Sequence, residues 1–142
     1  CEIHGFSKEK NAEKIKELSK QLGLENILHK KAGKLSGGLQ RRLSIAMALI
    51  SEPSVLFLDE PTLGLDVIAR SELWDIINGL KGRTTVILTT HYMEEAESLS
   101  DRIGIMKNGK LLAVGTAQEL IKMTASKSFE DAFISIVKGE KK

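Results

Sequence analysis

The feature that most constrains the fold of this chain is a pair of short apolar runs separated by a helical pattern. Residues 55–58 are consecutive apolar residues followed directly by Asp59, and residues 84–90 form a β-branched run that leads into His91. Apolar runs of this length are typical of strands in a parallel sheet that is covered on both faces. Residues 66–80, between the two runs, show the spacing of an amphipathic helix. The strand–helix–strand order predicts the α/β class.

Further helices are predicted on either side of this unit. Residues 8–22 place apolar side chains on one stripe before Gly23, and residues 36–50 precede Pro53. A helix starting at His91 is expected to reach about Leu99. In the helix over residues 66–80, the side chains available for burial are Ile68, Trp74, Ile76, Ile77 and Leu80.

A hairpin is predicted in the last third of the chain. Residues 102–107 and 110–114 flank Asn108-Gly109, a pair typical of two-residue hairpin turns. The stretch from Gly104 to Lys110 also has the G-x-x-x-x-G-K spacing of a phosphate-binding loop, but Leu111 stands where that loop needs Ser or Thr. Because strand patterns lie on both sides, we interpret it as a turn. Helices over residues 116–123 and 128–137 follow, the second with the capping-box spacing Ser128-x-x-Asp131.

Composition excludes several classes of function. The 142 residues, 42% hydrophobic and 28% charged, suit one globular domain. The net charge of +2 and the few aromatic residues give no basis for a nucleic-acid partner. Cys1 is the only cysteine, so an internal disulfide is excluded, although a lipidated N-terminal cysteine stays an alternative. The apolar runs are far shorter than the ~20 residues of a membrane span.

Two acids at the end of the first strand are candidates for chemistry. Parallel strands direct their carboxyl ends at the ligand crevice of an open α/β sheet. Asp59 there could hold a Mg²⁺-bound water, and Glu60 could orient or deprotonate an attacking water. The alternative is a strand that ends in two acids, with Asp59 capping the next segment.

Two other features could contact phosphate. Ser36, Gly37 and Gly38 open a helix, where uncovered N–H groups and the helix dipole favour an anion, although a simple helix cap is the alternative. His91 follows the second strand and could hydrogen-bond a phosphate or a water, although such a histidine is usually an ordinary loop residue.

Taken together in this order, these segments resemble the ATP-binding subunits of ABC transporters. Residues 35–38 are similar to the family signature, and residues 55–60 to the Walker B strand with its glutamate. Residues 63–66 are similar to the D-loop, and His91 to the switch histidine. The spacing also fits, with ~20 residues between signature and Walker B and ~30 more to the histidine.

The resemblance implies a partial P-loop NTPase domain over residues 1–142. Residues 1–50 would form a helical-subdomain segment with the signature, and residues 51–142 the C-terminal part of the catalytic core. It implies ATP and Mg²⁺ as cofactors, with Asp59 on the metal through water. Glu60 and His91 would be catalytic. The residues implied to contact the nucleotide are Ser36, Gly37, Gly38, Gln40 and Asp66.

The resemblance also implies partners and a location. A second ATPase subunit would form a head-to-tail dimer, and a transmembrane permease would hold the domain at the cytoplasmic face of the membrane. Residues 91–97, Arg41-Arg42 and residues 129–133 are similar to the branch that exports drugs, lipids or polysaccharides.

The family's Walker A loop and Q-loop glutamine are not found before the signature, so the chain alone is expected to be inactive.

Three alternative functions stay open. The first is a non-catalytic module that offers its signature in trans. The second is a DNA-repair or chromosome-type ATPase, although residues 8–22 are too short for the coiled coil expected there. The third is a generic α/β domain. Apolar surface on the strands is also expected to be left open or to be covered by self-association.

Overall fold

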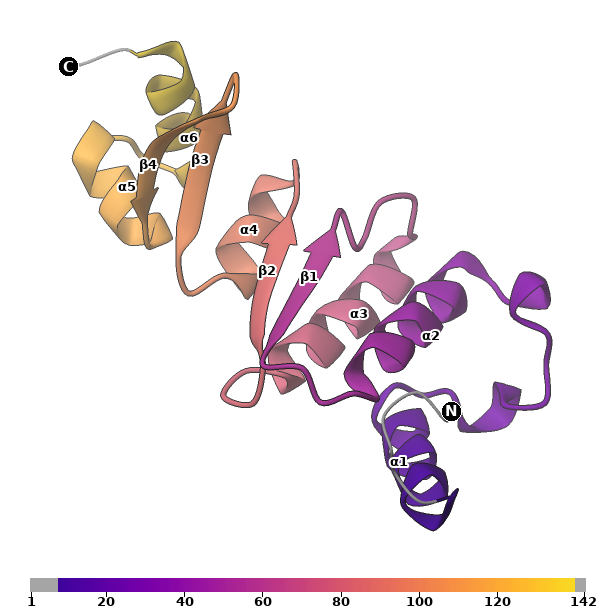
Figure 1. Cartoon of the computed structure of the whole chain (residues 1–142). Coiled ribbons are helices and arrows are strands. Elements are labelled where there is room, and N and C mark those ends of the chain that lie inside the picture. The colour runs from indigo at the N-terminus through magenta and orange to yellow at the C-terminus, as the bar shows by residue number, and fades with distance from the viewer. Residues whose placement is uncertain (1–7, 140–142) are drawn as a thin grey trace. The chain divides into compact units, whose positions relative to one another are not determined.

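The computed structural model describes residues 8–139, which fall into two compact units, one ending at Thr89 and the next starting at Thr90 (Figure 1). The first unit contains the helices and strands α1 (Lys8–Gln21), η1 (Glu25–Ile27), η2 (Ala32–Lys34), α2 (Gly37–Leu49), β1 (Val55–Asp59), α3 (Val67–Gly79) and β2 (Thr85–Thr89). The second contains α4 (Met93–Leu99), β3 (Ile103–Lys107), β4 (Lys110–Gly115), α5 (Ala117–Thr124) and α6 (Phe129–Lys138).

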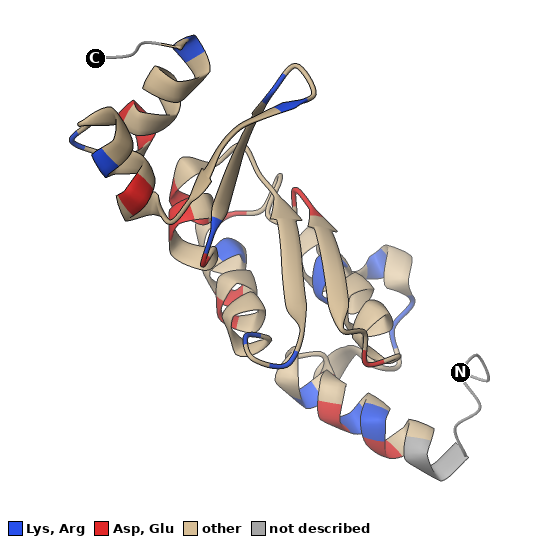
Figure 2. Cartoon of the chain, turned by 60° about the vertical axis from the view of Figure 1, so that its left-hand side comes forward, with Lys and Arg blue, Asp and Glu red and all other residues tan. Residues whose placement is uncertain are grey.

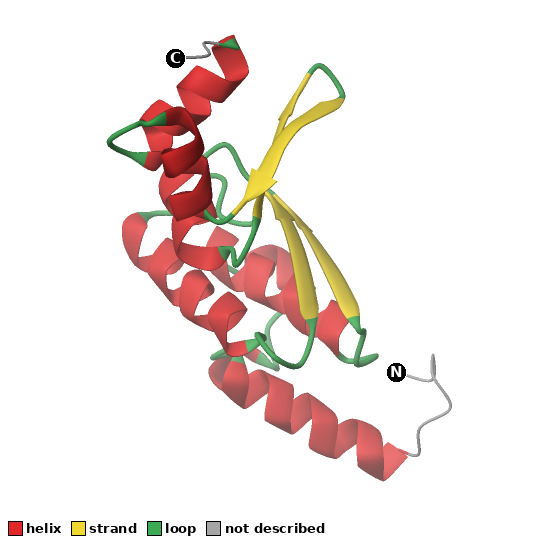
Figure 3. Cartoon of the chain, turned by 90° about the vertical axis from the view of Figure 1, so that its left-hand side faces the viewer, coloured by secondary structure: helices red, strands yellow, loops and turns green. Residues whose placement is uncertain are grey.

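The first unit is built on a parallel strand pair. β1 and β2 pair without a register shift, from Val55 opposite Thr85 to Asp59 opposite Thr89, and α3 connects them. Helices α2 and α3 lie on one face of the pair (Figures 1 and 3). The predicted parallel α/β arrangement is therefore confirmed.

Within the part of the chain that the structure describes, only one face of the strand pair is covered. Leu56 and Leu58 are buried, whereas Val55, Phe57 and Ile87 are 41%, 72% and 48% exposed. Alternation of this kind follows from the period of a strand, whose successive side chains point to opposite faces. The expectation that some apolar surface on the strands stays open is confirmed.

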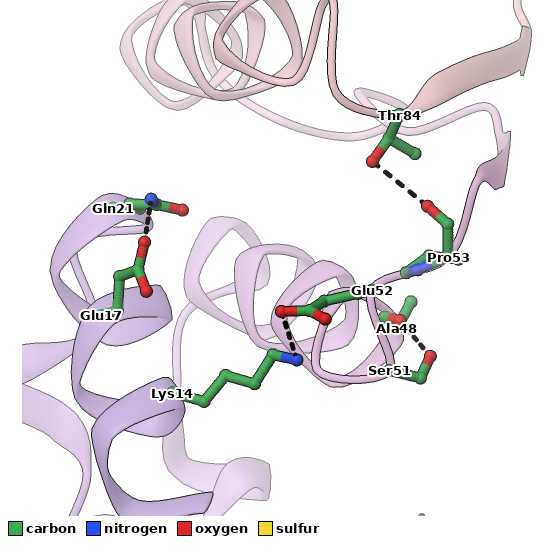
Figure 4. Close-up of polar contacts among 8 residues, drawn as sticks. All are labelled: Lys14, Glu17, Gln21, Ala48, Ser51, Glu52, Pro53 and Thr84. Carbon is green, nitrogen blue, oxygen red and sulfur yellow. Dashed lines mark hydrogen bonds and ion pairs between the residues drawn. The ribbon is translucent and has the colours of Figure 1, made fainter. Parts of the chain in front are cut away.

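Local contacts fix how the chain enters β1. Lys14 on α1 forms an ion pair of 2.6 Å with Glu52, which precedes the strand (Figure 4). The Thr84 hydroxyl, just before β2, donates a hydrogen bond of 3.3 Å to the Pro53 carbonyl (Figure 4). These contacts tie α1 and the start of β2 to the same short segment before β1.

The second unit packs two helices against a hairpin. β3 and β4 are antiparallel, and Asn108 and Gly109 have φ of 51° and 72°, as a hairpin turn of this type requires. The phosphate-loop spacing around Gly109 therefore belongs to a turn, as predicted. One buried apolar cluster in this unit consists of Ala96, Ile103, Ile105, Ala117, Leu120 and Phe129.

Caps define the helices of the second unit. Ser128 accepts a hydrogen bond from the Asp131 N–H, as the sequence spacing predicted. The complete reciprocal capping box lies instead at the start of α5, between Thr116 and Glu119. The helix predicted from His91 begins two residues later, at Met93. No helix within residues 8–139 has both the length and the apolar character that a membrane crossing requires.

The predicted burial of Ile68 is wrong. Its side chain is 73% exposed, whereas Leu73 and Ile77, four residues apart, form the buried stripe of α3. A helix turns about 100° per residue, so Ile68 lies about 140° around the axis from Leu73. The apolar stripe of α3 is thus narrower than the sequence pattern indicated.

Phe57 is the largest side chain on the uncovered face of β1 and β2, so Phe57→Thr should reduce binding of an apolar fluorescent dye and self-association of the 142-residue chain. Threonine favours strands, so β1 should persist. The control is Ile68→Thr, which removes an equally exposed apolar side chain from α3. Dye fluorescence and light scattering measure the effect, and equal decreases in both variants would contradict it.

Candidate functional site

The acidic end of β1 is organised by a single hydroxyl group. Because Asp59 pairs with Thr89 in register, the two side chains lie at the same edge of the strand pair, where Figure 2 shows acidic residues in red. The Thr89 hydroxyl donates a hydrogen bond to the Asp59 carboxylate. The same oxygen accepts from the Glu60 N–H at 3.3 Å. A hydroxyl can do both at once, so Thr89 joins the two acidic residues.

Glu60 has an unusual backbone conformation. Its φ is 43°, in the left-handed region that residues other than glycine seldom occupy. The Glu60 N–H also donates to the Thr89 carbonyl at 3.0 Å, and the Glu60 carbonyl accepts from the Leu63 N–H at 3.2 Å. The Glu60 carbonyl is also reached by the Arg41 guanidinium, at 3.4 Å. Hydrogen bonds on both sides of the residue hold it just beyond the strand.

Ser36 is the N-cap of α2. Its hydroxyl accepts from the Leu39 N–H at 3.5 Å, and its carbonyl accepts from the Gln40 N–H at 2.9 Å. The Gln40 side-chain amide donates to the Leu35 carbonyl at 3.0 Å. Locally, Ser36 therefore acts as a helix cap, which was the alternative to a phosphate contact. A capped N-terminus still presents N–H groups and a positive dipole end, so phosphate contact stays a prediction.

The two glycines after Ser36 differ in their surroundings. A Cβ atom on Gly38 would lie 3.2 Å from the Ala69 Cβ on α3, whereas one on Gly37 would lie 3.9 Å from the nearest Leu65 carbon. Gly38 therefore lets the start of α2 approach the start of α3 closely. This packing role was not predicted from the sequence.

Asp66 caps α3. Its carboxylate accepts from the Ala69 N–H at 2.9 Å, and its side chain is exposed. Since Gly38 lies close to Ala69, the beginnings of α2 and α3 lie together. Residues 36–38 are therefore near the loop that leads from Glu60 to Asp66. A contact between Asp66 and a nucleotide stays a prediction.

His91 belongs to the second unit. The residue is exposed, and its ring lies 4.1 Å from that of Tyr92, centroid to centroid. The Thr90 hydroxyl accepts from the Tyr92 N–H at 3.0 Å. The structure thus brings Asp59, Glu60 and Thr89 together within the first unit, and the proximity of His91 to them stays a prediction.

The predicted metal site rests on a single carboxylate. Over residues 8–139, no three His, Cys, Asp or Glu side chains gather into a group that could hold a metal ion. Mg²⁺ often binds through one or two carboxylates together with waters and substrate phosphates. Asp59, exposed at the strand end, fits that mode and not an all-protein cage.

Two residues of this arrangement were missed in the sequence. Thr89 could have been found by aligning the two predicted strands at their carboxyl ends, since that register places it opposite Asp59. No sequence feature indicated the role of Arg41, because its contact with Glu60 spans 19 positions and depends on how α2 packs.

Sequence comparison points to one family. The family model described as "ABC transporter" matches residues 2–63. ABC transporter A family member 4 of Arabidopsis thaliana is 52% identical over 102 residues, covering 72% of this chain and 11% of that protein. The daunorubicin resistance ATP-binding protein DrrA3 of Streptomyces coeruleorubidus is 45% identical over 119 residues, covering 83% of this chain and 38% of that protein.

Solved structures agree. An ATP-binding subunit of an ABC transporter superposes with a TM-score of 0.78 at 26% identity, over 94% of this chain and 57% of that one. The chain belongs to the ABC transporter ATP-binding family. MJ1267, an ATP-binding cassette of an ABC transporter, has a TM-score of 0.75 at 27% identity, over 88% of this chain and 49% of that one. The chain spans about half of these structures and a smaller share of its curated relatives.

For this ABC ATP-binding chain, we expect Gly38→Ala to be less stable than Gly37→Ala by about 1–3 kcal/mol, the usual cost of overpacking. The added methyl group at Gly38 meets Ala69 at 3.2 Å, whereas the one at Gly37 finds an ordinary contact. Alanine favours a helix equally in both variants, so the difference isolates the packing effect. Urea denaturation measures it, and equal free energies of unfolding would contradict close packing at Gly38.

Proposed function

We propose that the chain supplies the signature and hydrolysis residues of an ATPase that powers transport across a membrane. The observation that supports this most is the Thr89 hydroxyl, which joins the Asp59 carboxylate and the Glu60 N–H at the end of a parallel strand pair. Membership of the ABC transporter ATP-binding family supports ATP hydrolysis as the reaction that this arrangement would serve.

Asp59 and Glu60 take different roles in this proposal. Asp59 is exposed at the strand end and would hold Mg²⁺ through a water, while the metal supplies charge to stabilise the phosphates. Glu60 is half-buried, with its backbone held on both sides, and would take the proton of the attacking water. A backbone held in this way helps to position the carboxylate, and proton transfer depends on a positioned acceptor.

The start of α2 would serve a second subunit. Ser36, Gly37 and Gly38 would contact the γ-phosphate of a nucleotide held by the partner ATPase subunit in a head-to-tail dimer. The helix N-terminus and its dipole support this, since both favour a negative ligand. Gln40 and Asp66, which anchor the starts of α2 and α3, would line the same nucleotide.

His91 would act on the subunit's own nucleotide. It follows the last residues of the run that forms β2 and is exposed. A hydrogen bond to the terminal phosphate or to the attacking water is the role we propose for it.

The transport direction that we propose is export, with a permease partner that holds the domain at the cytoplasmic face of the membrane. Similarity to DrrA3, named as a daunorubicin resistance protein, supports an exporter. The human phospholipid-transporting ATPase ABCA3, 43% identical over 117 residues and 82% of this chain, supports a lipid or drug as cargo, although the chain covers only 7% of it.

In an ATPase-active protein that contains these residues, Glu60→Gln should lower kcat by about 10²- to 10⁴-fold, since the amide has the same shape but cannot take a proton. The affinity for ATP should not change. Glu52→Gln is the matched control, because Glu52 also has a positive φ, 50°, but precedes β1 and pairs with Lys14. Phosphate release and equilibrium ATP binding are the measurements. Equal kcat in wild type and Glu60→Gln would favour the non-catalytic module.

The 142-residue chain by itself should show no Mg-ATPase activity above background. The only G-x-x-x-x-G-K spacing in it forms the β3–β4 turn, so no loop grips the β- and γ-phosphates as a P-loop does. A phosphate-release assay at saturating Mg-ATP tests this, and turnover of about 1 per second, an ordinary enzyme rate, would refute it.

A further inference from the structure

Arg41 joins two parts of the site that the proposed function treats separately. It lies on α2, the helix that begins at Ser36, and its guanidinium donates a hydrogen bond of 3.4 Å to the Glu60 carbonyl. Arg41 is half-buried. One side chain therefore runs from the helix that would face the partner's nucleotide to the backbone of the hydrolytic glutamate.

The backbone of Glu60 needs support. A non-glycine residue with φ of 43° persists only where its surroundings over-determine it. Thr89 holds the N–H side of Glu60, and Leu63 together with Arg41 holds the carbonyl side. The Arg41 guanidinium adds a charged donor on the carbonyl side, through a long hydrogen bond of 3.4 Å.

The helix that bears Arg41 is itself anchored to the segment after Glu60. Gly38 lies against Ala69 on α3, and Arg42, with a side chain only 14% exposed, forms an ion pair with Glu72 further along α3. Because these contacts hold α2 against α3, the backbone of Arg41 is held in place relative to Glu60.

We propose that Arg41 is a positioning residue that sets the orientation of Glu60 and couples it to the placement of Ser36 at the start of α2. This inference rests on the proposed function. Because Arg41 extends from α2, the position of this helix sets the position of the guanidinium that contacts the Glu60 peptide.

The expected kinetic effect is specific to the chemical step. Loss of Arg41 leaves the groups that bind nucleotide in place but removes one of the hydrogen bonds to the Glu60 carbonyl, so the carboxylate shifts relative to the attacking water. A small displacement of a reacting group can cost up to about 10²-fold in rate. Because substrate binding is unaffected, kcat falls while the KM for ATP stays the same.

The test uses an ATPase-active protein that contains these residues. Arg41→Ala should lower kcat by about 10-fold or more, with an unchanged KM for ATP and an unchanged melting temperature. Arg41→Lys, which keeps a cationic donor, should recover most of that loss. Arg83→Ala is the matched control, because Arg83 is exposed in the loop before β2 and should give wild-type values.

Each outcome decides the proposal. A kcat equal to wild type in Arg41→Ala overturns it, as does a loss that Arg41→Lys does not restore. A melting temperature that falls together with kcat assigns Arg41 to folding alone and also overturns it. Equal kcat in wild type and Glu60→Gln removes the proposed function and this inference with it, whereas a loss in Glu60→Gln with an unaffected Arg41→Ala removes the inference only.

Discussion

The pairing of β1 with β2 is the constraint on which the candidate site depends. The strands run parallel without a register shift, so Asp59 and Thr89 end at the same edge. Parallel pairing thereby brings two residues 30 positions apart into hydrogen-bond contact. The Thr89 hydroxyl uses its donor on Asp59 and an acceptor position on the Glu60 N–H. A slip of one residue would place Thr89 on the opposite face and separate all three.

The second constraint is the close approach of α2 to α3. Gly38 permits it, since any larger residue would meet Ala69. Gly38 also lies in the segment proposed to contact phosphate. Helix packing and the proposed phosphate contact therefore both depend on this position. Arg41 and Arg42 then extend from α2 to Glu60 and Glu72, respectively. Helix α2 is thus joined to Glu60 and to α3 through side chains as well as close backbone packing.

Most elements of the fold could be predicted because they depend on local physics. The individual strands β1 and β2, the Ser36 cap and the Asn108-Gly109 turn follow from apolar runs, capping residues and backbone preferences a few residues apart. The burial of Ile68 was wrong, because apolarity alone does not show which stripe of a helix meets its neighbour. The full capping box at Thr116 was overlooked in favour of Ser128.

The sequence by itself determined the order of strands and helices, the caps, the turn and the two acids at a strand end, since each depends on neighbouring residues. It also determined the family, through motifs in a fixed order. Only the tertiary structure decided that Thr89 joins Asp59 to Glu60, that Gly38 meets Ala69 and that Arg41 reaches the Glu60 carbonyl. Those contacts join residues 19 to 31 positions apart, and strand register and helix packing set them.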